Sequence, residues 1–159
     1  MEKFGYRFSF GPWNIHEGSD PFGPPVRPTR SFADKLSVYR KLGFDAVQFH
    51  DDDAVPGLDD KSPAQIESDA RMMKQMLADS GLAAEFVAPR LWEHPLTIDG
   101  GFTANDPAAR AYARDRAHKC LDIAQTLGTN LIVLWLAREG TYLREAKDAV
   151  LAVNRLADA

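Results

Sequence analysis

The feature of this sequence that most constrains its fold is a regular alternation of short apolar runs and longer helical patterns. Four runs are rich in aromatic or β-branched residues and bounded by glycine, proline or polar residues, which predicts buried strands at residues 8–11, 46–49, 84–87 and 131–135. The unit repeats about every 40 residues, which indicates βα units around a parallel sheet.

The segments between these runs carry helix patterns with clear end signals. Each of the first three begins at a side chain able to cap a helix and ends at a glycine; they run from Ser31 to Gly43, from Ser62 to Gly81 and from Asp106 to Gly128. A fourth pattern begins near Leu143 and continues into the last residues, 156–159.

Two architectures fit this alternation, a (β/α)8 TIM barrel and a doubly wound open sheet. The loop after the first run is long and proline-rich, and it lacks the glycine pattern of a dinucleotide site, which favours the barrel. A barrel needs eight units and about 250 residues. We therefore expect residues 1–159 to be the N-terminal half of a single barrel domain, with about four βα units, truncated near the end of the fourth helix. The alternative is an autonomous half-barrel, which would expose two sheet edges.

Composition narrows the function to small-molecule chemistry. Hydrophobic residues make up 45% of the 159 residues, charged residues 26%, and the net charge is −4, which argues against nucleic-acid or anionic membrane partners. Cys120 is the only cysteine, the first residues lack the apolar run typical of a signal peptide, and no stretch approaches the roughly 20 apolar residues of a membrane span. We expect a cytoplasmic protein.

The second run ends in Phe49-His50-Asp51-Asp52-Asp53, where a parallel strand would face the active site. A histidine beside a carboxylate can act as a general acid or base. A solvated acidic loop and a divalent metal site are the alternatives.

Aromatic residues follow the other strands. Trp13 and Trp135 lie just past strands one and four, and Trp92 a few residues beyond strand three. Together they could form an apolar wall around His50, although each alone is more typical of core packing. Residues 100–106 read as a turn before a helix cap. Residues 138–140 fit either a salt bridge at the barrel mouth or a surface loop. His94 and His118 read as surface or hydrogen-bonded structural residues.

The order of several motifs resembles the xylose isomerases, and most closely their short, actinobacterial-type class. The motifs are Ser9-Phe10-Gly11-Pro12-Trp13, Asp20-Pro21-Phe22-Gly23, Phe49-His50-Asp51-Asp52-Asp53, His94-Pro95, Gly100-Gly101-Phe102-Thr103-Ala104-Asn105-Asp106, and Trp135 with Arg138-Glu139-Gly140. Each motif is weak by itself, whereas the ordered set covers essentially the whole chain.

This resemblance implies a homotetrameric TIM-barrel enzyme that interconverts D-xylose and D-xylulose with two divalent ions, Mg, Mn or Co. It implies that His50 assists opening of the cyclic sugar, that Asp53 orients His50, and that a hydride then shifts between C1 and C2. Trp13, Trp92 and Trp135 would wall the substrate, and Phe22 would enter a neighbouring subunit's site. The metal ligands of the family would lie beyond Ala159, so this fragment alone is expected to be inactive and to bind no metal.

Two departures from the family pattern leave the sugar open. Ala88-Pro89-Arg90 stands where the family commonly has Thr-Thr-Asn, and Leu136-Ala137 where it has two glycines. Another pentose, a hexose or a deoxy sugar is therefore an alternative substrate. A related sugar epimerase, a metal-dependent phosphodiesterase resembling endonuclease IV, and a non-catalytic half-barrel are alternative functions.

Overall fold

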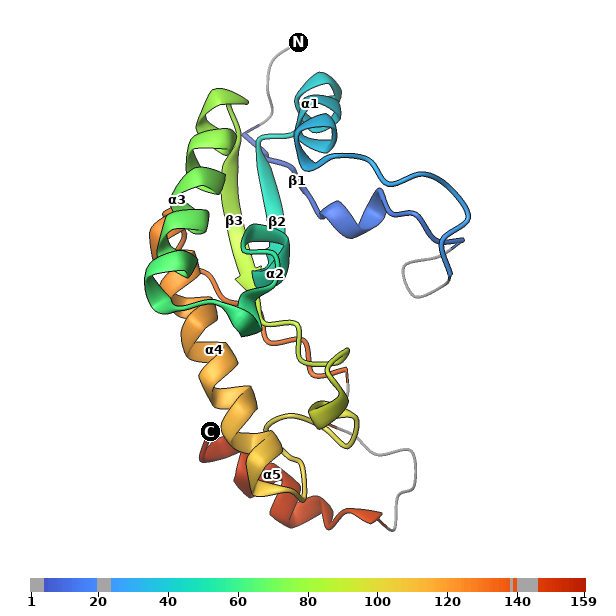
Figure 1. Cartoon of the computed structure of the whole chain (residues 1–159), viewed down its shortest axis with the longest axis vertical. Helices are drawn as coiled ribbons and strands as arrows, with labels where there is room; N and C mark the ends of the chain where they lie inside the picture. The colour runs from blue at the N-terminus through green and yellow to red at the C-terminus, as the bar shows by residue number, and fades with distance from the viewer. Residues whose placement is uncertain (1–4, 20–23, 138, 140–145) are drawn as a thin grey trace.

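The computed structural model describes residues 5–19, 24–137, 139 and 146–159 (Figure 1). Three parallel strands form the sheet: β1 (Ser9–Phe10), β2 (Ala46–His50) and β3 (Ala83–Ala88). The longer helices are α1 (Phe32–Leu42), α3 (Pro63–Asp79), α4 (Pro107–Leu127) and α5 (Ala149–Ala157). Shorter helical segments are α2 (Asp51–Ala54), η1 (Pro12–Asn14), η2 (Leu58–Asp60) and η3 (Pro95–Thr97).

The strand order agrees with the barrel rather than the doubly wound sheet. The strands lie in sequence order, β1-β2-β3, and Val87 of β3 forms a parallel bridge to Ile132, so the next segment continues the same order. A doubly wound sheet instead reverses its strand order at a switch point. The described part of the chain is therefore a mixed α/β structure consistent with part of a barrel.

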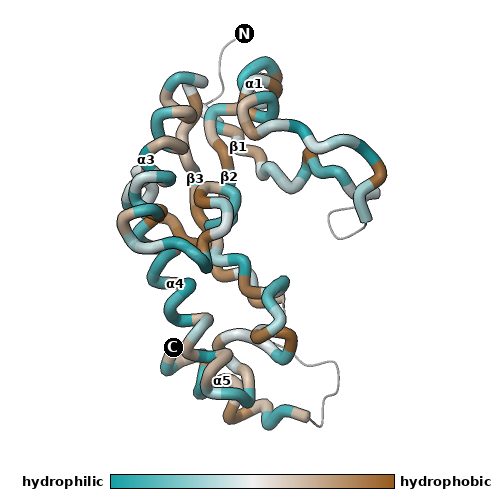
Figure 2. Tube along the Cα trace, in the orientation of Figure 1, coloured by the Kyte–Doolittle hydropathy of each residue, from teal (hydrophilic) through white to brown (hydrophobic). Residues whose placement is uncertain are grey.

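The main core lies on one face of this sheet. Val47 and Phe49 of β2 and Val87 of β3 are buried there, because side chains alternate along a strand. Apolar residues of α1, α3 and α4 join the same cluster: Leu36, Tyr39, Ile66, Ala70, Met73, Leu77, Cys120, Ile123, Ala124 and Leu127. Figure 2 shows the hydrophobic trace along β2 and β3 and the hydrophilic stretches along α3 and α4. Because the helices share one face, the opposite face is left for the barrel interior.

The predicted helix ends are confirmed. Ser31 accepts a hydrogen bond from the Asp34 amide, and Ser62 forms a reciprocal capping box with Gln65. Gly43 and Gly128 end α1 and α4 with φ of 85° and 90°, a left-handed conformation that glycine adopts without a steric cost.

The prediction of a fourth strand at residues 131–135 is wrong, because this segment forms an isolated β-bridge instead of a strand. Residues 131–135 make only the bridge at Val87, through hydrogen bonds between Val87 N and Leu131 O (3.2 Å) and between Val133 N and Val87 O (3.1 Å). Within the described residues, the β-bridge of this segment runs to β3, so the segment is held along that edge. Leu131 and Leu134 are about half exposed.

The fourth helix also begins later than predicted. Asp148 caps it by accepting a hydrogen bond from the Leu151 amide (2.7 Å), and α5 starts at Ala149 rather than near Leu143. Figure 1 shows α5 beside the first half of α4, beyond the end of the sheet, and Leu156 packs there against a second buried cluster that contains Leu91 and Phe102. No helix in the described part of the chain combines the length and apolar character needed to cross a membrane.

Candidate active site

A cavity of about 480 Å³ opens at the carboxyl ends of β2 and β3. Side chains from η1, both strands and the segments that follow β3 line it: Trp13, Asn14, His50, Phe86, Ala88, Arg90, Trp92, Glu93, Val133 and Trp135. Ligands bind at this end of the strands in parallel β/α folds. The structure thus brings all three tryptophans of the chain to the cavity that His50 lines.

His50 is the last residue of β2 and the N-cap of α2. One turn later, Asp53 accepts a hydrogen bond from the His50 backbone amide at its Oδ2 (3.1 Å), and the same oxygen lies 3.2 Å from Nδ1 of the imidazole. Residues three apart on a helix share a side, so the short helix α2 creates this pairing. The predicted histidine–carboxylate pair is therefore formed.

The three indoles surround the histidine in a chain of ring contacts. The Trp13 and His50 ring centroids lie 4.6 Å apart, and the edge of Trp92 meets His50 at 5.0 Å. Trp135 in turn meets Trp92 at 4.5 Å. Trp92 is buried, whereas Trp135 is 48% exposed and forms the outer wall. This arrangement provides flat apolar surfaces beside one polar ring.

Gly11 allows Trp13 to take this position. A Cβ atom at residue 11 would lie 2.2 Å from the Trp13 indole, far inside van der Waals contact. A larger residue would therefore push the indole away from His50. This close approach explains the glycine in the motif Ser9-Phe10-Gly11-Pro12-Trp13.

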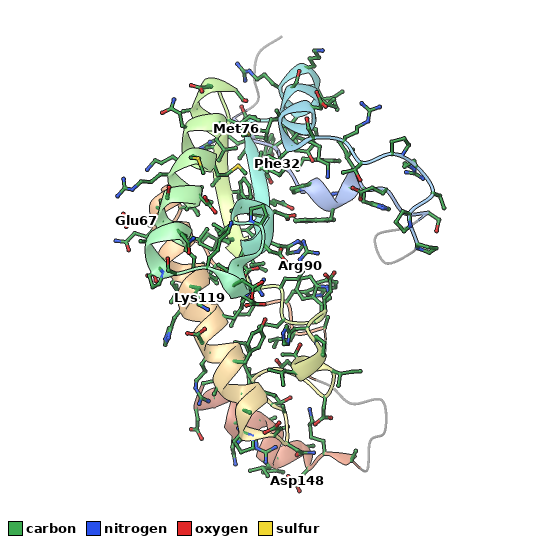
Figure 3. The ribbon with its side chains drawn as sticks, viewed as in Figure 1. Phe32, Glu67, Met76, Arg90, Lys119 and Asp148 are labelled. Atoms are coloured by element: carbon green, nitrogen blue, oxygen red, sulfur yellow. The ribbon has the colours of Figure 1, made fainter. Side chains whose placement is uncertain are left out.

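Arg90 lies at the centre of the site, but the sequence did not single it out as a site residue. Its Nε donates to Asp52 Oδ1 (2.8 Å), its Nη1 to Glu93 (3.1 Å), and its Nη2 lies 2.9 Å from His50 Nδ1. Figure 3 shows Arg90 just beyond the carboxyl ends of β2 and β3. The rule that residues after a parallel strand face the site, applied to β3, would have selected it.

The charges of this cluster shift the pKa values of its members. Burial raises the pKa of Asp53, but hydrogen bonding from His50 and the charge of Arg90 outweigh it, so the net pKa lies below the ordinary value. Burial also raises the pKa of Asp52, and there the charge of Arg90 compensates only in part. The two carboxylates, together, raise the pKa of Arg90 against the effect of its burial. The cluster favours an ionised Asp53 beside His50.

The acidic segment after β2 is not a solvated loop. Asp51 is fully buried and pairs with Arg116 of α4 through two contacts, Nε to Oδ2 (2.5 Å) and Nη2 to Oδ1 (2.9 Å). The Arg90 amide donates to the same carboxylate (3.1 Å). Asp51 therefore ties α2, α4 and the end of β3 together, a link that joins residues far apart in the sequence.

Two further predicted features have different outcomes. The Glu139 carboxylate accepts hydrogen bonds from the amides of Gly101, Phe102 and Thr103 (2.8–3.0 Å), which anchors the turn at residues 100–106. The predicted alternatives for residues 138–140, a salt bridge or a surface loop, fall partly outside the described residues. His94 is hydrogen-bonded, as predicted, because its Nδ1 accepts from the Leu96 amide (3.2 Å). Phe22, Arg138 and Gly140 lie outside the described residues.

The family of the chain follows from a comparison with known protein families. Residues 36–159 match the family described as the xylose isomerase-like TIM barrel. The chain belongs to this family. The match begins within α1, runs to the end of the chain, and includes His50, Asp53, Arg90, Trp92 and Trp135. The xylose isomerase-like family includes sugar isomerases and epimerases.

The residues described do not fit a metal centre. Among them, no group of three or more His, Cys, Asp or Glu side chains is placed to hold a metal ion. The carboxylates of Asp52, Asp53 and Glu93, at or beside the cavity, all pair with the guanidinium of Arg90 instead.

Proposed function

We propose that this protein works as an aldose–ketose sugar isomerase, with D-xylose and D-xylulose as the leading substrate pair. One observation carries the proposal: a histidine paired with an aspartate lies inside a tryptophan-lined cavity at the strand ends of a xylose isomerase-like chain. A sugar combines apolar C–H faces with polar hydroxyls, which suits indole walls beside a single polar ring.

The described residues would act on the cyclic sugar. Opening the ring breaks the bond between C1 and the ring oxygen while a proton passes from the anomeric hydroxyl to that oxygen. His50, whose backbone amide donates to Asp53, lies where its imidazole can hydrogen-bond the reacting oxygens, and the indoles of Trp13 and Trp92 exclude water beside it. A hydride then shifts from C2 to C1 while the proton of the C2 hydroxyl passes to O1, which converts the aldose into the ketose.

The two divalent ions and the homotetramer expected from the family resemblance belong to the proposal as well. Because the described residues do not fit a metal, we assign no step of this chain to one. The test of the site can therefore begin with sugar binding, which depends on the described residues that line the cavity.

The identity of the sugar depends on the altered mouth of the cavity. Ala88 and Arg90 line the cavity in the segment that departs from the family pattern. We therefore include a related isomerase or epimerase acting on a hexose or deoxy sugar as the second candidate, and a panel of aldoses and ketoses as the probe.

Sugar binding can be measured by intrinsic fluorescence, because every tryptophan of the chain lines this cavity. We expect a saturable change with at least one aldose, and His50→Asn should raise its Kd by about tenfold, the effect of one lost hydrogen bond. His118→Asn on the exposed side of α4 is the matched control and should bind like the wild type. The absence of a saturable response to every sugar would refute binding at this cavity.

Turnover is the second measurement, made on the enzyme loaded with Mg, Mn or Co. Ketose formed from cyclic aldose should fall by about 100-fold or more in His50→Asn, the usual contribution of a positioned acid or base. A wild-type rate in that variant would show that His50 has no role in ring opening.

A further inference from the structure

The Nδ1 atom of His50 has two neighbours with opposite hydrogen-bonding character. Arg90 Nη2 lies 2.9 Å away and Asp53 Oδ2 lies 3.2 Å away. A guanidinium can only donate, and an ionised carboxylate can only accept. In neutral histidine, Nδ1 either holds a lone pair that accepts from Arg90 or holds a proton that it donates to Asp53. It cannot satisfy both neighbours.

The surrounding contacts favour the interaction with Arg90. Asp52 and Glu93 hold the guanidinium by its other two nitrogens, at 2.8 Å and 3.1 Å. Both oxygens of Asp53 already accept hydrogen bonds, Oδ2 from the His50 amide (3.1 Å) and Oδ1 from Arg90 Nη2 (3.4 Å). A proton on Nδ1 would face the N–H of Arg90 at 2.9 Å in a site with little solvent. A lone pair on Nδ1 instead accepts a hydrogen bond from Arg90, so neither the imidazole nitrogen nor the guanidinium is left unpaired there.

We propose that Arg90 is a positioning residue that keeps neutral His50 in the tautomer with its proton on Nε2. His50 lines the cavity, and Nε2 makes no hydrogen bond with any residue that the structure describes, so it is the ring nitrogen left to meet a ligand. In this tautomer, the Nε2–H group of His50 can donate a hydrogen bond into the cavity, but Nε2 has no lone pair with which to accept a proton.

The ligand that fits such a donor has an acceptor oxygen at this point. For a sugar, that atom would be the ring oxygen of the cyclic form or the carbonyl oxygen of the open form, a part of the inference that rests on the proposed function. An Asp-paired histidine with its proton on Nδ1 would instead accept a proton or hydrogen bond from a hydroxyl. Arg90 thereby sets which kind of substrate oxygen His50 can bind.

The tautomer can be read directly by NMR on protein labelled with ¹⁵N in its histidine rings. Spectra recorded at about pH 9, well above the ordinary histidine pKa of about 6.5, show the neutral forms. Two-bond correlations between ring protons and nitrogens distinguish the tautomers, and His50→Asn identifies the His50 signals. His94 is an internal reference for the Nε2–H form, because its Nδ1 accepts from the Leu96 amide.

We expect the Nε2–H form for wild-type His50. Arg90→Met should shift the proton toward Nδ1, where Asp53 accepts it, with a change of about tenfold or more in the tautomer ratio. Arg71→Met is the matched control, because Arg71 pairs with the exposed Glu67 on the side of α3 away from Arg90 (Figure 3). It should leave the ratio unchanged.

Three results would overturn the inference: the Nδ1–H form in the wild type, an unchanged ratio in Arg90→Met, or an equal change in Arg71→Met. If Arg90→Met does not fold, the wild-type spectrum remains the test, since a tautomer set by Asp53 would be the Nδ1–H form. These spectra need no ligand. A tautomer that responds to Arg90 in a protein that binds no sugar would therefore uphold this inference and refute the proposed function.

Discussion

Replacing Arg116 with methionine should strongly destabilise the protein while keeping much of the volume of the side chain. Arg116 is 4% exposed and Asp51 is fully buried. The substitution removes both guanidinium contacts at 2.5 Å and 2.9 Å, and leaves the carboxylate with only the amides of Asp52 (2.9 Å) and Arg90 (3.1 Å). It creates a buried, poorly compensated negative charge.

The expected magnitude follows from this burial. Breaking a buried ion pair by removing one partner costs about 3–5 kcal/mol, a large part of the roughly 5–15 kcal/mol that stabilises a typical domain. The contact of Arg116 Nη1 with Asp59 (2.9 Å) is also lost, but Asp59 is 36% exposed and this contact adds little. We therefore expect Arg116→Met to lower the free energy of unfolding by about 3–5 kcal/mol.

Urea unfolding followed by circular dichroism measures this difference. Arg71→Met is the comparison, since the Arg71–Glu67 pair is exposed and should be worth about 1 kcal/mol or less. In Asp51→Asn/Arg116→Met the buried charge is absent but an oxygen remains for the two amides, so the double variant should be more stable than Arg116→Met alone. Equal losses in Arg116→Met and Arg71→Met, or a double variant no better than the single one, would refute the reasoning.

Three other predictions concern Tyr39, Asp53 and Cys120. The Tyr39 hydroxyl is buried and has no hydrogen-bond partner among the described residues, so Tyr39→Phe should raise the free energy of unfolding by about 1 kcal/mol in urea; a clear loss would contradict this. The folded state lowers the pKa of Asp53, so its stabilising effect is present above the ordinary carboxyl pKa of about 3.9 and is lost as the pH falls through the folded value. Asp53→Asn should therefore lose less stability than the wild type between about pH 5 and pH 2, and an identical pH profile would count against it. Cys120 is fully buried and burial raises the pKa of its thiol, so a disulfide reagent should react with it only after unfolding in urea; rapid reaction in buffer would contradict this.

Asp53 contacts His50 and Arg90, and Tyr39 packs in the main core, so each of these substitutions needs a check that the fold is retained. Far-ultraviolet circular dichroism provides it for both variants. Asp34→Asn, at the exposed start of α1, is a suitable control for the pH profile because its carboxylate lies away from Arg90.

Local signals explain why the helices and most strands were predictable. Ser31 and Ser62 cap helices through hydrogen bonds that span three residues, and Gly43 and Gly128 end helices through their own backbone conformation. Such features depend on neighbouring residues alone, so they can be read along the chain. The His50–Asp53 pair was accessible for the same reason, since the two residues are three apart.

The failures have a common physical cause as well. Whether residues 131–135 form a strand depends on pairing with β3 and with a neighbour on the other side, and the buried state of Asp51 depends on Arg116, 65 residues further along the chain. Neither partner can be identified from local spacing. The sequence of residues 51–53 therefore does not reveal whether their carboxylates are exposed to solvent or buried.

The sequence by itself determined the βα alternation, the helix ends and a histidine with a nearby carboxylate at a strand end. The tertiary structure decided which other groups meet that histidine. Trp13, Trp92 and Arg90 reach it from η1 and from the segment after β3, and Arg90 lies 40 residues beyond it. Because hydrogen-bonding partners brought together by folding set the tautomer of an imidazole, the chemistry of His50 is a property of the fold.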